Sequence, residues 1–502
     1  MAPRRRLAAF CTLWVLLPVA AGGEKTAPPL PLAGPVGGLV DEYRAASGAD
    51  VAVHVVRMTD GKALCDIRSG ELLIPASNQK ILTSAVALKR LGRDFRFRTR
   101  LVMIGKDLVV VGDGDPTTGD ARLAAAREET IYAAFDRWAA ALKKKGVSRI
   151  TGDLVVRAGI FQPPHCHPDW PAGQRGRWYS APVAGVNFAD NCIDVGFTVS
   201  GKEVRAVVSP RSRFLAVESH VRLGKRHLWT GRFDEVGRRL TLSGTVTRAT
   251  ASPLPVAAPS PPMLFGCVLA DVLARAGIAL DGAIVVSTDP PAAGDKDAQP
   301  VAVETMELGA VLYRANKQSL NMMAECLFLR SAVADGKPAT WRKAAEAARR
   351  VLVSDYGLAG DSFSVADGSG YSRNNRVSPA ALTALLRALA GEPHFFRSLP
   401  VSGEDGSLRN RLRGPVCRGR IRAKTGYIAR VSALSGYILD RRGKAAMAFS
   451  ILLNGSTRGK GYSAHRLQEA ICQALIGALD APATTAPATT PPARRLSPRS
   501  GP

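Results

Sequence analysis

This sequence of 502 residues lacks three features, and each absence excludes a class of protein. The apolar stretch at residues 7–17 is short for a membrane span, and no other apolar run is long enough to form one. Neither the G-x-S-x-G nor the H-E-x-x-H motif occurs, which excludes two classes of enzyme, the α/β-hydrolases and the zincins. The basic residues are dispersed, are mostly arginine and form no patch interleaved with aromatic side chains. We therefore expect no nucleic-acid binding, despite a net charge of +26.

Cysteine is also sparse. Of the eight cysteines, one lies at position 11 and the others are widely scattered, which excludes a dense disulfide framework but allows one or two bridges. Cys326 and Cys472 lie in apolar helical patterns and are expected to be buried thiols. The segments "PPHCHPDW" and "GDGDPTTGD" contain potential metal ligands, but we interpret them as a loop and a turn, because the second lacks the distal glutamate of a calcium loop. No metal and no cofactor are expected.

The two ends of the chain have the composition of segments outside the folded part. Three arginines, the apolar residues 7–17 and small residues at 20–22 predict a secretory signal peptide over residues 1–22, with an uncleaved anchor as the alternative. We therefore expect an exported protein of the periplasm or cell envelope. The Pro-, Ala- and Thr-rich tail, residues 481–502, is expected to be disordered. The positive charge suggests peripheral association with anionic envelope polymers or a membrane surface, and a basic surface without a specific partner is the alternative.

Helical and strand periodicities divide the remaining chain. A predicted hairpin turns at residues 59–62, and a helix begins near Ser77. Residues 95–300 contain many short strand patterns, interrupted by one helical run at residues 131–145. Helical spacing then returns, followed by three predicted strands, the last two joined by a turn at residues 440–443, and a closing helix. We predict one discontinuous domain of residues 23–94 and 301–480, with residues 95–300 inserted as a β-rich segment. This arrangement would bring Ser77 close to residues beyond 300.

Ser77 stands three residues before Lys80, where an apolar run begins, and two interpretations are open. Ser77 could be a helix N-cap, with Lys80 pointing into water. On a helix, however, positions i and i+3 lie about 5 to 6 Å apart on one face, so the lysine amine could reach the serine hydroxyl. An S-x-x-K motif should arise by chance roughly once in such a chain, so further motifs must decide.

Two further motifs supply candidate partners. K-T-G occupies residues 424–426 on a predicted strand, and S-x-N is formed by Ser319 and Asn321 at the start of a helical run. Ser372 and Asn374 form a rival S-x-N motif. S-x-x-K, an S-x-N element and K-T-G, in this order, form the motif set of penicillin-binding proteins and class A β-lactamases. Their joint occurrence makes chance a poor explanation.

The chain resembles the class C low-molecular-mass penicillin-binding proteins, the D-alanyl-D-alanine carboxypeptidase/endopeptidase family of DacB-type serine peptidases. The resemblance covers nearly everything between the signal peptide and the tail. It rests on "PASNQK", "GDGDPTT", "WYSAPVAGVNFADN", "SLNMMAE", "DGSGYSRNNRVSP", "SGEDGSLRNR" and "KTGY". In this family the second motif precedes the D-G-S-G segment, which favours Ser319 and Asn321. The resemblance implies an α+β fold: a β-lactamase/transpeptidase-like domain, with an antiparallel sheet flanked by helices, and a large β-rich insertion that forms one or two extra domains.

The resemblance and the chemistry of these residue types together suggest roles. Ser77 would attack the carbonyl between two terminal D-alanines with Lys80 as its base, and Ser319 would relay a proton to the leaving amine. The expected substrate-binding residues are Asn321, Lys424, Thr425 and Gly426. Backbone N–H groups of Ser77 and Tyr427 would form the oxyanion hole. Expected partners are peptidoglycan stem peptides and, as acylating inhibitors, β-lactam antibiotics. Leu320 and Tyr427 depart from the residues usual in this family, and we expect the reaction to tolerate both.

Two other functions stay open at this point. A serine β-lactamase shares the motif set, but class A enzymes use an additional glutamate for deacylation, and no obvious counterpart motif lies between residues 77 and 319. The long insertion also favours a peptidoglycan enzyme. A catalytically inactive envelope scaffold of the same fold is the second alternative, which the presence of all the expected side chains disfavours.

Overall fold

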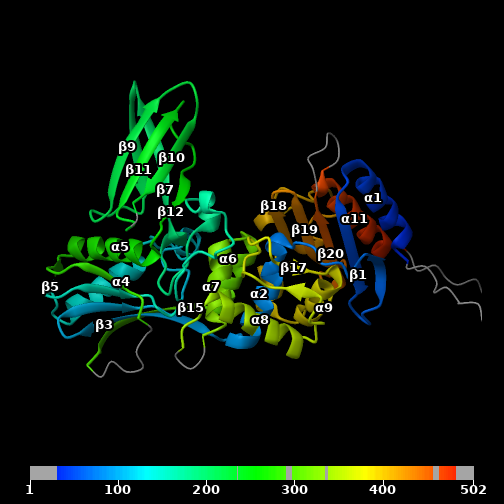
Figure 1. Cartoon of the computed structure of the whole chain (residues 1–502), viewed down its shortest axis with the longest axis horizontal. Helices are drawn as coiled ribbons and strands as arrows, with labels where there is room; N and C mark the ends of the chain where they lie inside the picture. The colour runs from blue at the N-terminus through cyan, green and yellow to red at the C-terminus, as the bar shows by residue number, and fades with distance from the viewer. Residues whose placement is uncertain (1–30, 235, 290–296, 334–336, 456–462, 482–502) are drawn as a thin grey trace, which may run out of the picture.

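A computed structural model gives the structure of residues 31–234, 236–289, 297–333, 337–455 and 463–481. The predicted signal peptide and all but the first residue of the predicted tail lie outside these ranges. Figure 1 shows two parts: the two ends of the chain together form the part on the right, and the middle of the chain forms the part on the left. Within the ranges described, no helix is long and apolar enough to cross a membrane.

The part formed by both chain ends is centred on a five-stranded antiparallel sheet with the order β18-β19-β20-β1-β2. Its strands are β1 (Asp50–Arg57), β2 (Ala63–Ile67), β18 (Ile421–Ile428), β19 (Val431–Leu439) and β20 (Ala445–Asn454). β1 pairs with β20 along its whole length, which joins the first and last strands of the chain. Both predicted turns are present, one between β1 and β2 and one between β19 and β20.

Helices cover both faces of this sheet, so its central strands are apolar on both sides. Val51, Val53 and Val55 pack toward α1 (Ala33–Ser47) and α11 (Ala464–Asp480). The alternate β1 residues pack toward the helices of the opposite face, because successive side chains of a strand point to opposite sides. The helices of that face are α2 (Gln79–Leu91), α6 (Leu308–Lys317), α7 (Asn321–Arg330), α8 (Trp341–Ser354), α9 (Pro379–Leu389) and α10 (Pro393–Ser398). The predicted α+β fold is confirmed.

Helix α2 runs through the middle of this helical layer, as Figure 1 shows between α7, α8 and the sheet. Its residues from Gln79 to Leu88 are all buried. A helix that is enclosed on every side has no solvent face on which to place a charge. A lysine in its first turn therefore has to find its partners inside the protein.

The middle of the chain forms three main sheets of its own. A five-stranded sheet has the order β14-β6-β4-β3-β15, and two three-stranded sheets have the orders β12-β7-β8 and β10-β11-β9. The strands are β3 (Arg96–Ile104), β4 (Asp107–Val111), β6 (Leu154–Arg157), β7 (Cys192–Ser200), β8 (Glu203–Ser209), β9 (Ala216–Leu223), β10 (Leu228–Phe233), β11 (Arg239–Val246), β12 (Leu254–Ala257), β14 (Ile284–Ser287) and β15 (Gln299–Glu307).

The sequence predicted one helical run in this β-rich part, and the structure corrects that expectation. Helix α4 (Ala133–Lys144) corresponds to the predicted run, but α5 (Pro261–Arg275) was not anticipated, nor was the short α3 (Ala121–Ala125). Nearly all of α5 is buried beside the five-stranded sheet, so its sequence has no polar face and shows no helical period.

The two connections between the parts lie side by side. β3 and β15 pair antiparallel, with Arg96 opposite Glu307, and the amide of Leu308 donates to the carbonyl of Phe95 at 3.0 Å. The predicted boundary at residues 300 and 301 therefore falls inside β15. We propose that the insertion extends to Glu307, because a strand that completes the sheet of the insertion belongs with it.

All the cysteines within the described ranges are free thiols, and most of them are buried, Cys326 and Cys472 among them. The bridges that the sequence allowed are not formed among these residues.

Candidate active site

Ser77 lies in a single turn of 3₁₀ helix, η1 (Ala76–Asn78), that leads directly into α2. Lys80, in the first turn of α2, donates from Nζ to Ser77 Oγ at 3.0 Å, as the i, i+3 spacing allows. The alternative of a surface lysine is wrong, because Lys80 is 1% exposed. The N-cap alternative also fails, since the residue at the N-cap is Asn78 and no side chain caps the helix.

Lys80 uses all three of its N–H donors. Besides Ser77 Oγ, Nζ donates to Asn321 Oδ1 at 2.7 Å and to the carbonyl oxygen of Ser369 at 2.9 Å. Burial lowers the pKa of Lys80 to about 7, and the negative charges of Glu325 and Asp367 oppose this effect. A lysine with this pKa is partly unprotonated near neutral pH and can accept the proton of a serine hydroxyl.

The S-x-N element lies where α6 leads into α7. Ser319 has a positive φ of 59°, a left-handed conformation that is uncommon outside glycine. Its Oγ accepts a hydrogen bond from Lys424 Nζ at 2.8 Å, and Lys424 also donates to the carbonyl of Thr425 at 2.9 Å. Lys424 is fully buried, and its burial, with the neighbouring Lys80, keeps its pKa well below the usual value. The structure thus brings both lysines and both S-x-N side chains to one place.

Strand β18 passes directly beside the Ser77 turn. At Gly426 the two are so close that a Cβ atom would lie 2.8 Å from the carbonyl oxygen of Pro75 and 3.1 Å from the amide nitrogen of Ser77. Thr425 Oγ1 is 2.7 Å from Ser407 Oγ, and the Tyr427 side chain is 60% exposed. β18 is an edge strand whose outer side pairs at its beginning, through Arg422. Thr425, Gly426 and Tyr427 follow along the same strand, next to Ser77.

The rival S-x-N motif is engaged elsewhere. Ser372 Oγ donates to Asp169 Oδ2 at 2.7 Å, and Asn374 Nδ2 donates to the same oxygen at 2.8 Å. These bonds tie the rival motif to the insertion. Of the two motifs, it is Ser319 and Asn321 that contact the lysines, Asn321 bonding Lys80 and Ser319 bonding Lys424.

Comparison with known proteins places this constellation in a family. Residues 38–474 match the profile of the D-Ala-D-Ala carboxypeptidase 3 (S13) family. The chain belongs to this family. A D-alanyl-D-alanine carboxypeptidase of Actinomadura sp. (strain R39) is 31% identical over 94% of this chain and 90% of its own length. D-alanyl-D-alanine carboxypeptidase DacB of Haemophilus influenzae is 25% identical over 82% of this chain and 87% of its own length.

The S13 fold is also found in a solved structure. The crystal structure of penicillin binding protein 4 (dacB) from Haemophilus influenzae has a TM-score of 0.72 at 23% identity, covering 88% of this chain and 99% of that one. The family profile and the 31% identical relative show that this chain is a serine-type D-Ala-D-Ala carboxypeptidase, a hydrolase. A β-lactamase and an inactive scaffold are not favoured.

Several residues that surround the motifs of this S13 enzyme had no role predicted from the sequence. Asn321 Nδ2 donates to the carbonyl of Tyr179 at 2.7 Å, so the insertion helps to orient this side chain. Ser369 contributes a carbonyl to Lys80, and Glu325 and Asp367 contribute charge. Glu325 follows Asn321 by four positions on α7, and this i, i+4 spacing was a signal that it shares the face of Asn321.

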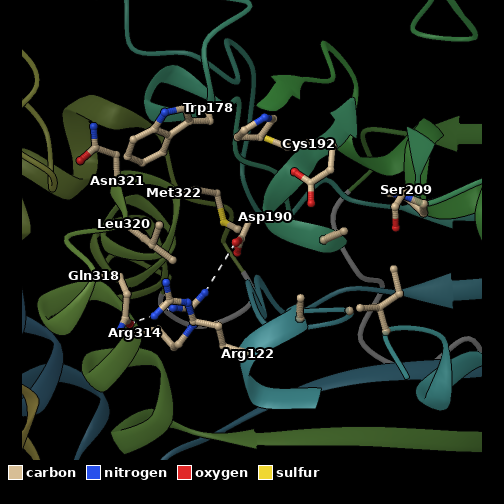
Figure 2. A pocket seen from close by; sticks show the side chains of 17 residues that line it. Arg122, Trp178, Asp190, Cys192, Ser209, Arg314, Gln318, Leu320, Asn321 and Met322 are labelled. Atoms are coloured by element: carbon tan, nitrogen blue, oxygen red, sulfur yellow. Dashed lines mark hydrogen bonds and ion pairs between the residues drawn. The ribbon is translucent and has the colours of Figure 1, made fainter. Parts of the chain in front are cut away.

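A charged cavity of about 350 Å³ is lined by the α6–α7 connection of the S13 enzyme, Asn321 included, and by residues of the insertion (Figure 2). Arg314 of α6 donates from Nε to Asp120 Oδ2 at 2.7 Å, and both side chains are almost fully buried. Its Nη2 lies 3.6 Å from Asp190 Oδ2, the contact drawn in Figure 2. Asp120 and Asp190 belong to the insertion, so these ion pairs fasten it to the helix that leads to Ser319.

Proposed function

We propose that Ser77 is the nucleophile of this carboxypeptidase and Lys80 its general base. The carrying observation is a buried lysine amine 3.0 Å from the Ser77 hydroxyl, with a pKa lowered to about 7 by burial. Ser77 Oγ forms a bond to the carbonyl carbon between two terminal D-alanines while its proton passes to Lys80 Nζ. The carbonyl oxygen becomes an oxyanion, held by the backbone N–H groups of Ser77 and Tyr427.

Collapse of this intermediate breaks the C–N bond. Ser319, which accepts a hydrogen bond from Lys424, relays the proton that Lys80 took from Ser77 to the departing amine of D-alanine, and Lys80 becomes neutral again. Water then attacks the acyl-enzyme, releases the shortened peptide and restores the Ser77 hydroxyl. Asn321 holds the substrate amide, and Lys424, Thr425 and Gly426 bind the terminal carboxylate, which accepts hydrogen bonds.

The substrate we propose is the stem peptide of peptidoglycan, in cell-wall remodelling. An extended peptide can lie along β18 beside Thr425, because an edge strand offers backbone groups for an added strand. The same steps would cleave a crosslink if the departing amine belongs to a second stem peptide, so endopeptidase activity needs no further residue. We also propose export to the periplasm or cell envelope, where the net charge of +26 would favour contact with anionic surfaces.

Mass spectrometry of the purified protein after incubation with benzylpenicillin tests this assignment. We expect a stable adduct on Ser77 that is absent from Ser77→Ala. Ser372→Ala is the matched control, since it removes a buried serine from the rival motif and should leave acylation in place. Rapid turnover of the drug would indicate a β-lactamase, and an unmodified wild-type protein would indicate a scaffold. An adduct that persists in Ser77→Ala would show that another residue is the nucleophile.

A further inference from the structure

The third partner of Lys80 is a backbone carbonyl, and one buried carboxylate holds that backbone in place. Glu325 of α7 is 0% exposed. Its Oε2 accepts from the amide of Gly368 at 2.7 Å, and its Oε1 accepts from the amide of Ser369 at 2.8 Å. The carbonyl of Ser369 in turn accepts from Lys80 Nζ at 2.9 Å. Glu325 therefore contacts Lys80 through a single residue of backbone.

The backbone of residues 367–370 has little room to move. Gly370 has a φ of +84°, and a Cβ there would lie 1.8 Å from the carbonyl oxygen of Ala76, in the turn that carries Ser77. The side chain of Asp367 also holds the segment in its turn, because its Oδ1 accepts from the amide of Gly370 at 2.7 Å. The segment is thus wedged between the Ser77 turn and the two carboxylates.

Glu325 also supplies charge. The charged groups that face Lys80 are Glu325 on α7, Asp367 on this segment and Lys424 on β18. Burial and the Asp367 charge raise the pKa of Glu325 to about 8, although the backbone N–H donors of Gly368 and Ser369 partly offset this rise. Each Glu325 oxygen accepts an N–H, which suits the carboxylate form, because a protonated oxygen would set its O–H against one of these donors.

We propose that Glu325 is a positioning residue for acylation, which holds the Ser369 carbonyl against Lys80 and provides the buried negative charge that stabilises the Lys80 ammonium as it forms. The ammonium forms when Ser77 gives its proton to Lys80, so this charge makes Lys80 a stronger base. The same charge keeps Lys80 protonated to a higher pH at rest. Removing the Glu325 charge should therefore move the acid limb of the pH profile to lower pH and also lower the maximal rate. This inference rests on the proposed role of Lys80 as the base.

The test is the second-order rate constant of acylation by benzylpenicillin between pH 5 and 9. In Glu325→Gln we expect the acid limb to move to lower pH by about one unit, since an opposite charge nearby shifts a pKa by about 1 to 3 units. We expect the plateau rate to fall about tenfold or more, because small displacements of a base are costly. In Glu325→Asp, which keeps the charge on a shorter side chain, the limb should stay near its wild-type position while the plateau falls.

Glu346→Gln is the matched control. It removes one carboxylate from the neighbouring helix α8, where Glu346 is 47% exposed and paired with Arg342, and should change neither limb nor plateau. A limb that stays in place in Glu325→Gln would overturn the proposal, whatever the plateau does, because a structural lesion lowers the rate without moving the limb. If Glu325→Gln does not fold, a wild-type plateau in Glu325→Asp would overturn it. A wild-type protein that is not acylated at all would instead refute the proposed function.

Discussion

The close passage of β18 beside the Ser77 turn makes Gly426→Ala an informative substitution. The added methyl group would stand 2.8 Å from the carbonyl oxygen of Pro75, 3.0 Å from the Cβ of Ala433 and 3.1 Å from the amide nitrogen of Ser77. Since comfortable contacts begin at about 3.5 Å, the strand and the turn must separate by about 0.5 Å or more. Two of these three atoms belong to backbone, so side-chain rotation cannot relieve the clash.

This separation would act on the oxyanion hole, because the proposed N–H donors of Ser77 and Tyr427 lie on opposite sides of the gap that it widens. Loss of one such donor costs about 2.7 to 4 kcal/mol, equal to a factor of about 10² to 10³ in rate. We therefore expect the acylation rate with benzylpenicillin to fall about 100-fold in Gly426→Ala. The assay is stopped-flow or quenched-flow acylation, with the melting temperature measured in parallel.

Gly443→Ala serves as the control for a general effect on the sheet. Gly443 has a φ of +79° in the turn between β19 and β20, with no atom within 4 Å of the position of a Cβ. Alanine there should cost about 1 kcal/mol of stability through its strained backbone and leave acylation unchanged. Acylation at the wild-type rate in folded Gly426→Ala would refute our placement of the oxyanion hole between the Ser77 turn and β18.

Three further results are expected. Only the unprotonated amine of Lys80 can accept the Ser77 proton, and burial lowers the pKa of this amine to about 7. The pre-steady-state rate of acylation should therefore fall about tenfold for each pH unit below that value and level off above it. A rate that does not change with pH would contradict this. Arg314→Met leaves the Asp120 carboxylate buried without its partner and should lower the free energy of unfolding by about 3 to 5 kcal/mol in urea titrations. The control Arg342→Met, at an exposed ion pair, should change it by less than about 1 kcal/mol. Equal effects would argue that the ion pair of Arg314 with Asp120 does not hold the insertion to α6. Binding to isolated cell walls should weaken as salt is raised from about 0.05 to 0.5 M, since the Debye length shortens, and salt-independent binding would exclude an electrostatic contact.

The sequence predicted the local features of this enzyme well. Helix geometry allowed the contact between Ser77 and Lys80, because an i, i+3 relation needs only one turn, and the further motifs favoured it over a helix cap with a surface lysine. The hairpin turns around residues 60 and 441 carry their own signals in Gly and Asp residues, and the strand that contains K-T-G has a clear strand pattern. Helix α5 was missed for a local reason as well, because a helix buried all round shows no period.

Contacts between distant segments were decided by the tertiary structure. Lys80 meets Asn321 across 241 positions and the Ser369 carbonyl across 289, and no pattern near Lys80 predicts either partner. Residue patterns alone left two S-x-N motifs open and the family resemblance favoured Ser319 and Asn321; the fold places these two against the lysines and the rival against Asp169. The pairing of β3 with β15 likewise supports our proposal of a later end for the insertion, since a strand joins the sheet that completes its hydrogen bonds.

The sequence by itself determined which chemical groups this carboxypeptidase has and in what order they occur, because the motifs are short and each is formed by a few consecutive residues. The tertiary structure decided the protonation chemistry of those groups. Lys80 has its lowered pKa only because α2 is enclosed by other helices, and it has a countercharge only because α7 brings Glu325 beside the 367–370 segment. Burial and the distances between charges depend on packing of the whole chain, and these two quantities set the reactivity of the site.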